Sequence, residues 1–246
     1  DMIEDFENGS VSNRSAWLNT GQGWSLNSSW RSPEPFTVNG QNNGRRIADV
    51  DGDGMADVVV TIGNVTVQYG RTWTKNGSSP FLLRKITNEY GGVSLVNYTP
   101  STFFDNTGGD NVSDIGFAVY VVSRYAVNNS LDGAFSVFGA TLYNYSGGRY
   151  DAQDVQFRGF SNVTESLPDG SVVRHHFFQD DVLKGREFRS EVLNGSGVLF
   201  SVSETNFTVS RAVPNSIIRV AFQTAFQYDG ALSAFVSNVS YAYDSF

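Results

Sequence analysis

Four aspartates fall within the nine residues from Asp49 to Asp57, in the stretch ADVDGDGMADVVV. So many carboxylates repel one another unless solvent or a bound cation neutralises them. Ca²⁺ takes about six to eight oxygen ligands from carboxylates, backbone carbonyls and water on a sharply folded loop. Alternate carboxylates on a tight turn converge on one point, and the glycines between them permit the bend. A solvated acidic turn is the alternative. We predict a structural Ca²⁺ ligated by Asp49, Asp51, Asp53, Asp57 and the backbone carbonyl of Met55.

The sequence around these aspartates distinguishes the loop from an EF-hand and from a Mg²⁺ site. An EF-hand places Glu at position 12 and has helical flanks, whereas position 12 here is Val60 and the flanks are strand-like. Mg²⁺ rarely accepts a full cage of protein ligands, so Ca²⁺ is favoured. The stretch FDNTGGDNVSD also carries Asp105, Asp110 and Asp114, but its spacing is looser and favours a solvated loop over a second site.

Acceptor sequences for N-glycosylation are unusually frequent. The chain has 21 Asn, 29 Ser and 15 Thr among 246 residues, from which chance gives about four Asn-x-Ser/Thr sequences. There are 13, at Asn8, Asn13, Asn27, Asn64, Asn76, Asn97, Asn111, Asn128, Asn144, Asn162, Asn194, Asn206 and Asn238. This excess predicts an extracellular or cell-surface glycoprotein carrying N-linked glycans, with most of these asparagines in solvent.

Catalytic chemistry has little support in the sequence. His175 and His176 are the only histidines, and as neighbours on a strand they point to opposite faces. No Gly-x-Ser-x-Gly nucleophile elbow is present. Asp180 and Asp181 diverge if they lie on a strand, so turn capping is favoured over a glycosidase-type pair. The basic residues that follow them predict local ion pairs; these are Lys184, Arg186 and Arg189. We therefore predict a protein without enzymatic activity.

Composition excludes several partners. The formal net charge is −8 and only 17% of residues are charged, which argues against nucleic acid as a partner. No run of about 18 apolar residues predicts a membrane span. The chain has no cysteine, so we expect neither disulfides nor a Cys-ligated metal. It opens without a basic signal-peptide region, which fits a mature or internal fragment.

The hydrophobic pattern predicts an all-β chain. Segments such as VSLVNYT, DIGFAVYVVSRYAV, GAFSVFGATLYNYS and SVVRHHFF are rich in β-branched and aromatic residues, and Gly, Asn, Asp and Ser bound them. PDGS (168–171) and NGSG (194–197) predict turns. Residues 180–193 are the best helical candidate, but Gly185 favours a turn followed by a strand.

All four tryptophans precede the stretch TKNGSSP, so we predict two units, residues 1–80 and 81–246. Core packing is the expected role of the aromatic residues, with sugar binding by exposed Trp as the alternative.

Longer phrases resemble a known family. WLNTGQGW followed by RIADVDGDGMADVVV resembles FG-GAP/VCBS repeats, whose Asp-rich loops hold Ca²⁺ in β-propeller blades. LLRKITNEYGGVSLVNYTPST follows, and then YDAQDVQFRGFSNVTESLPDGSVVRHHFFQDDVLKGREF. This order is similar to the Rhs-repeat and Tc-toxin B-component (SpvB-like) family, over about residues 16–207.

The resemblance implies an architecture and a role. The expected fold is a partial propeller-like FG-GAP/VCBS unit followed by a Rhs/YD-shell-like antiparallel sheet. Members of the family form hollow shells around a C-terminal cargo, so the implied role is a structural segment of such a shell or of a surface assembly. The implied partners are other protein chains or the rest of a larger polypeptide. An adhesion or carbohydrate-binding module is one alternative, and a toxin-delivery carrier with its cargo outside these residues is another.

Overall fold

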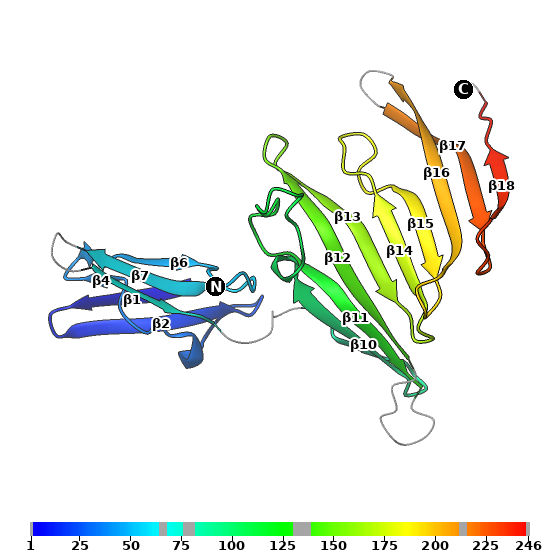
Figure 1. Ribbon diagram of the computed structural model, residues 1–246. Coiled ribbons are helices and arrows are strands. Elements are labelled where there is room, and N and C mark those ends of the chain that lie inside the picture. Colours follow the sequence, from blue (N-terminus) through cyan, green and yellow to red (C-terminus); the bar gives the residue numbers. More distant parts are fainter. Residues whose placement is uncertain (1, 64–67, 76–81, 130–138, 212–215, 245–246) are drawn as a thin grey trace. The chain divides into compact units, whose positions relative to one another are not determined.

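The computed structural model describes residues 2–63, 68–75, 82–129, 139–211 and 216–244 (Figure 1). Within them the chain forms eighteen β-strands and two short 3-10 helices, and no α-helix occurs in these ranges. The prediction of an all-β fold is confirmed. The chain divides into two compact units, Asp1–Pro80 and Phe81–Phe246.

The first unit contains two small sheets. The five-stranded sheet has the order β3-β2-β1-β4-β5, in which β1 and β4 are parallel and the other pairs are antiparallel. The three-stranded antiparallel sheet has the order β6-β7-β8. The strands are β1 Met2–Asn8, β2 Val11–Asn19, β3 Trp24–Leu26, β4 Thr37–Val38, β5 Gln41–Asn42, β6 Arg45–Ala48, β7 Asp57–Gly63 and β8 Gln68–Trp73, and the 3-10 helix η1 spans Ser28–Trp30.

The second unit is one ten-stranded antiparallel sheet whose strands are neighbours in chain order, from β9 at one edge to β18 at the other (Figure 1). The elements are β9 Lys85–Thr87, β10 Val93–Pro100, η2 Ser101–Phe103, β11 Tyr120–Asn128, β12 Gly139–Asp151, β13 Gln156–Ser166, β14 Val172–Phe177, β15 Glu187–Leu193, β16 Leu199–Arg211, β17 Ser216–Gln227 and β18 Phe235–Ser240. In the described part of this unit, η2 is the only regular element outside the sheet. The sheet is therefore a single layer.

Local sequence explains the hairpins. Leu167 and Ser171 close the turn between β13 and β14 with a 2.9 Å backbone hydrogen bond, and Gly170 takes the left-handed conformation (φ +85°) that this turn requires. Asn194 closes the β15–β16 turn by accepting hydrogen bonds from the backbone of Ser196 and Val198. Both predicted turns are confirmed, as is the prediction of a turn followed by a strand at residues 180–193.

Other boundaries differ from the sequence predictions. The strand expected from residue 114 begins only at Tyr120, because the preceding segment folds back onto β12 instead of pairing as a strand. Residues 64–67, between β7 and β8, and residues 130–138, at the start of the predicted segment GAFSVFGATLYNYS, lie outside the described structure.

The buried side chain of Asn106 fixes that fold-back. Its Nδ2 donates to the carbonyls of Ser101 (2.8 Å) and Phe104 (3.0 Å), and its Oδ1 accepts from the backbone N–H of Gly148 (2.9 Å). Asn106 is 2% exposed, so these bonds satisfy an amide that water cannot reach. The carboxylates of Asp105, Asp110 and Asp114 are exposed as predicted, but the backbone of their loop is fixed on β12.

A chain of aromatic rings packs beside this loop. Tyr145 lies 5.4 Å from Phe104 and 4.9 Å from Phe160, measured between ring centroids, and its hydroxyl donates to the carbonyl of Val122 (2.8 Å). Burial is the main reason that the pKa of Tyr145 is raised, to about 12. These rings serve packing, which is the role favoured from the sequence.

Few apolar side chains are fully covered. Among the described residues, those that are buried are Ala16, Val60, Ile115, Ala126, Leu193 and Val202. A sandwich of two packed sheets would bury alternate residues along every strand. The second unit thus depends on cross-strand pairing and on local packing instead of a thick core. No helix in the described residues has the length and apolarity needed to cross a membrane.

We predict that Gly148→Ala destabilises the protein. An added Cβ would lie 2.3 Å from Ile115 Cδ1 and 2.6 Å from Asn106 Oδ1, which are both fixed in buried positions. Overpacking of this kind costs about 1–3 kcal/mol. Urea unfolding followed by tyrosine fluorescence measures the change. Gly116→Ala is the control, because its added Cβ meets nothing within 4 Å. Equal midpoints for the two variants would contradict the packing described.

Candidate functional site

The aspartate loop, residues Asp49–Asp57, connects β6 to the start of β7. Gly52 and Gly54 both have positive φ, +77° and +81°, and these conformations turn the chain back on itself. As a result, one carboxylate oxygen from each of Asp49, Asp51 and Asp57 lies within 4.8 Å of the other two. The loop therefore places three acidic oxygens around a common point.

Backbone N–H groups hold the carboxylates of the loop in place. Asp49 accepts from Gly52 (2.8 Å) and Gly54 (2.9 Å), and Asp53 accepts from Met55 (2.8 Å). Each oxygen has two lone-pair directions, so an oxygen that accepts one N–H still has a direction free for a cation. The loop is thus shaped by its own backbone, and its carboxylates retain ligating capacity.

Asp57 connects the loop to a more distant part of the chain. Its side chain is fully buried (0% exposed); Oδ2 accepts from the N–H of Val50 at 2.9 Å and Oδ1 from the N–H of Lys75 at 2.8 Å. The ammonium group of Lys75 lies 3.9 Å from the ring centroid of Trp30, a cation–π contact. Asp57 therefore ties together the loop and the residues that follow β8.

The five predicted ligands are not placed alike. Asp53 lies outside the group of three converging carboxylates. Burial raises the pKa of Asp53, and the negative charges of Asp51, Asp49 and Asp57 raise it further. Ligation by Asp53 and by the Met55 carbonyl therefore stays a prediction, while the structure brings Asp49, Asp51 and Asp57 together.

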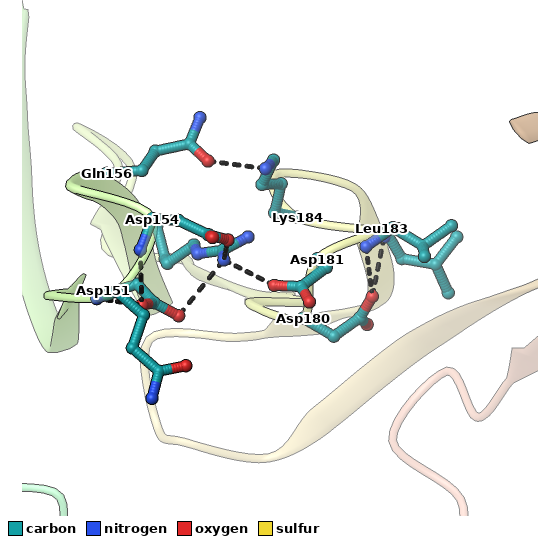
Figure 2. A network of polar contacts seen from close by, with 10 residues as sticks. Asp151, Asp154, Gln156, Asp180, Asp181, Leu183 and Lys184 are labelled. Atoms are coloured by element: carbon teal, nitrogen blue, oxygen red, sulfur yellow. Dashed lines mark hydrogen bonds and ion pairs between the residues drawn. The ribbon is translucent and has the colours of Figure 1, made fainter. Parts of the chain in front are cut away.

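A second polar site, which we call the Arg158 cluster, consists of Arg158, Asp151, Asp154 and Asp181 (Figure 2). Nη2 of Arg158 donates to Asp151 Oδ2 at 3.1 Å, to Asp154 Oδ2 at 2.5 Å and to Asp181 Oδ1. The Arg158 side chain is 1% exposed, whereas that of Asp181 is 76% exposed. One buried cation thus links the β12–β13 hairpin to the loop between β14 and β15.

Backbone hydrogen bonds favour the charged form of Asp151 in this cluster. The N–H groups of Asp154 and Gln153 donate to Asp151 Oδ1, and together with Arg158 they hold the pKa of Asp151 below its usual value. The neighbouring carboxylates outweigh desolvation and raise the pKa of Arg158. The guanidinium and the three carboxylates are therefore paired with one another. The three carboxylates could accept a metal ion only by competing with the resident guanidinium.

The loop that supplies Asp181 is itself held by hydrogen bonds. Asp180 Oδ1 accepts from the N–H groups of Val182 and Leu183, both at 2.8 Å, and Lys184 Nζ donates to Gln156 Oε1 at 2.5 Å (Figure 2). Gln179 Nε2 donates to the carbonyls of Gly147 and Gly159. Residues of the QDDVLKGR phrase therefore contact the strands β12 and β13.

Several sequence predictions are corrected by these contacts. Asp180 caps its turn as predicted, but Asp181 pairs with Arg158, a residue that the sequence analysis missed. The basic residues after Asp180 were expected to form local ion pairs. Lys184 instead bonds to Gln156, and the guanidinium of Arg186 lies over the ring of Phe207. The FRGF motif was the available signal, since an arginine between phenylalanines needs an acidic partner once it is buried.

The two histidines make separate contacts. His175 Nδ1 lies 2.8 Å from Glu187 Oε1, and His176 Nδ1 lies 2.7 Å from Asn162 Oδ1. Arg189, the third predicted basic residue, pairs with Glu191 at 2.8 Å and Glu204 at 2.5 Å. No serine or threonine nucleophile is seen bonded to either histidine in the contacts of the described residues.

The asparagines of the acceptor sequences differ in exposure. Asn8, Asn97, Asn111, Asn144, Asn206 and Asn238 are exposed, while Asn13, Asn27, Asn162 and Asn194 are half-buried. Asn128 is 7% exposed, which leaves little room for a glycan at this position in the fold. Asn64 and Asn76 lie outside the described residues.

Comparison with known proteins gives consistent results. A family model described as the insecticide toxin TcdB middle/N-terminal region matches residues 23–191. A search of curated proteins found no match. The fold resembles TcdB2-TccC3 (17% identity, TM-score 0.62) and TcdB2-TccC3 without its hypervariable C-terminal region (16%, 0.61), each over 92% of this chain.

It also resembles a Photorhabdus luminescens Tc holotoxin pore, at 17% identity and a TM-score of 0.62 over 89% of this chain. At such identities the likeness shows a shared fold. The chain spans 14% of the length of each of these three solved chains. The resemblance to a Tc-toxin B component is confirmed.

We predict that Arg158→Met lowers the melting temperature of the protein and makes this temperature depend on the salt concentration. The variant leaves three neighbouring carboxylates without their cation, and their repulsion is screened at high ionic strength. Thermal unfolding by circular dichroism at low and high salt measures both effects. A second substitution, Asp181→Asn, should restore part of the loss by removing one of the charges.

Arg174→Met is the matched control. Its side chain is 51% exposed and makes one ion pair, with Glu191 at 3.8 Å, so the expected change is about 0.5 kcal/mol or less. Arg158→Met behaving like Arg174→Met at both salt concentrations would show that the Arg158 cluster does not stabilise the sheet.

Proposed function

The chain belongs to the family of the insecticide toxin TcdB middle/N-terminal region, and we propose that it is a non-enzymatic scaffold segment of a toxin-complex type of β shell. The single-layer sheet of the second unit carries this proposal. Ten strands pair in sequence order, and in the described residues no second sheet covers them, although the segment between β10 and β11 folds back onto β12. Such a layer suits a wall that further chain segments extend.

The exposed apolar residues of the sheet agree with this role. Phe235 is 76% exposed and Val239 52% exposed on the edge strand β18, and Ile86 is 49% exposed on the opposite edge strand β9. Unpaired edge strands recruit other strands. The proposed partners are therefore other protein chains or further parts of a longer polypeptide. The solved relatives support this, since their names describe two-component and holotoxin assemblies.

Location outside a cell and N-linked glycosylation are part of the same proposal. The excess of acceptor sequences supports it, and so does the exposure of six of the asparagines. Glycans increase the solubility of large exposed surfaces.

The last part of the proposal is a structural Ca²⁺ in the aspartate loop. The converging oxygens of Asp49, Asp51 and Asp57 suit an oxygen-preferring cation, and all three carboxylates are already held by backbone N–H groups. The ion would supply positive charge that offsets the repulsion within the loop. Through Asp57 it would also stabilise the bond to Lys75.

Cryo-electron microscopy of the full-length protein tests the scaffold role. We expect the ten-stranded sheet within the wall of a hollow particle, with new strands hydrogen-bonded to β9 or β18. A map in which both edges of the sheet remain in solvent and no cavity is enclosed would overturn the proposal.

Removal of calcium tests whether the aspartate loop binds this ion. With excess Ca²⁺ the melting temperature should be higher than with EDTA, because an ion that binds only the folded state stabilises it, by about 2.7 kcal/mol at a hundredfold excess over Kd. Asp51→Asn should abolish this difference. Asp110→Asn, in the exposed loop before β11, should retain it. An unchanged melting temperature in EDTA for the unsubstituted protein would remove calcium from the proposal.

A further inference from the structure

Every asparagine in the described strands of the ten-stranded sheet belongs to a glycosylation acceptor sequence. The six are Asn97 on β10, Asn128 on β11, Asn144 on β12, Asn162 on β13, Asn206 on β16 and Asn238 on β18. Their strands extend across almost the whole width of the sheet (Figure 1). The face on which each one lies follows from the strand register.

The register places Asn162 and Asn238 on the same face. Residues directly opposite each other in an antiparallel sheet share a face. One continuous row of opposite residues crosses the sheet through Ser146, Asn162, His176, Arg189, Glu204, Thr224 and Asn238. Side-chain contacts along this row agree, since His176 bonds to Asn162 and Arg189 to Glu204.

The other four asparagines lie on that face too. Residues two apart on a strand share a face, so Asn144 joins Ser146 and Asn206 joins Glu204. Asn97 is opposite Arg124, which is opposite Leu142, two residues before Asn144. Asn128 is four residues after Arg124 on the same strand. All six share what we call the asparagine face.

Polarity alone does not explain this distribution. Hydroxyl residues occupy the opposite face as well, where Ser190 pairs with Ser203 and Ser201 lies two residues away. If the two faces were equivalent, six independent positions would agree with a chance of about 1 in 32. The excess of acceptor sequences is thus confined to one side of the sheet.

The asparagine face has both exposed and covered positions, since Ala126, Leu193 and Val202 on it are buried. Asn97, Asn144, Asn206 and Asn238 are exposed on it, and Arg189 pairs there with Glu191 and Glu204. Asn162 is half-buried and bonded to His176, and Asn128 is 7% exposed. Four positions can therefore accept a glycan without disturbing the sheet.

We propose that the asparagine face is the glycan-bearing, solvent-facing side of the sheet in the assembled protein, with glycans at Asn97, Asn144, Asn206 and Asn238. A glycan is too bulky and hydrophilic to lie beneath another protein segment. Whatever covers the sheet in the assembly therefore lies on the opposite face. This inference rests on the proposed glycosylated scaffold and adds its orientation.

The opposite face offers a matched test on the same strand. Ser203 is exposed on β16, three residues from Asn206, and Ser203→Asn completes an acceptor sequence with Thr205. The full-length protein is secreted from glycosylating cells, and glycopeptide mass spectrometry and size-exclusion chromatography follow occupancy and assembly. The double substitution Ser203→Asn and Thr205→Ala cannot be glycosylated and controls for folding.

We expect occupancy at the four exposed positions and normal assembly of the unsubstituted protein. Ser203→Asn should either stay unmodified or lose assembly, while its non-glycosylated control assembles. A glycan accepted at position 203 with assembly unchanged would overturn the orientation and leave the scaffold proposal standing. A native protein without any glycan would instead overturn the glycosylation itself, including its place in the proposed function.

Discussion

Hydrogen bonding between strands that are consecutive in the sequence is the constraint on which the second unit depends. Each strand from β10 to β17 pairs with the strand before it and the strand after it, so all backbone pairing in the sheet is between consecutive strands. Such a sheet needs no distant segment to complete its backbone pairing, and it can be extended at either edge. The low number of buried apolar residues follows from the same arrangement, because a single layer has no partner to interdigitate with.

A buried charge compensates for the thin core at one end of the sheet. Arg158 brings together carboxylates from β12, the following turn and the β14–β15 loop, while Gln179 bonds to two glycine carbonyls on β12 and β13. Removing a cation from water is costly unless several acceptors surround it, so these residues depend on each other. This explains why the phrases FRGF and QDDVLKGR occur together in the sequence: the structure brings them into contact.

The two units use acidic residues in different ways. In the aspartate loop, backbone N–H groups orient three converging carboxylates, an arrangement that suits an external ion. In the Arg158 cluster the cation is part of the chain. A scaffold of the Tc-toxin B-component kind gains from both devices, because each fixes a turn without a large hydrophobic core.

Local patterns in the sequence determined the strands, the turns at residues 168–171 and 194–197, and the family, because these depend on alternation, on Gly at positive φ and Asn side chains that close turns, and on contiguous phrases. They also indicated that the carboxylates of Asp49, Asp51 and Asp57 converge, since spacing within one loop is a local property. Three features came only from the tertiary structure. They are the pairing of Arg158 with Asp181, the burial of Asn106 and Asn128, and the common face of six asparagines. Each requires knowing which residues lie opposite one another across strands, and strand register is set by pairing that the spacing along one strand does not contain.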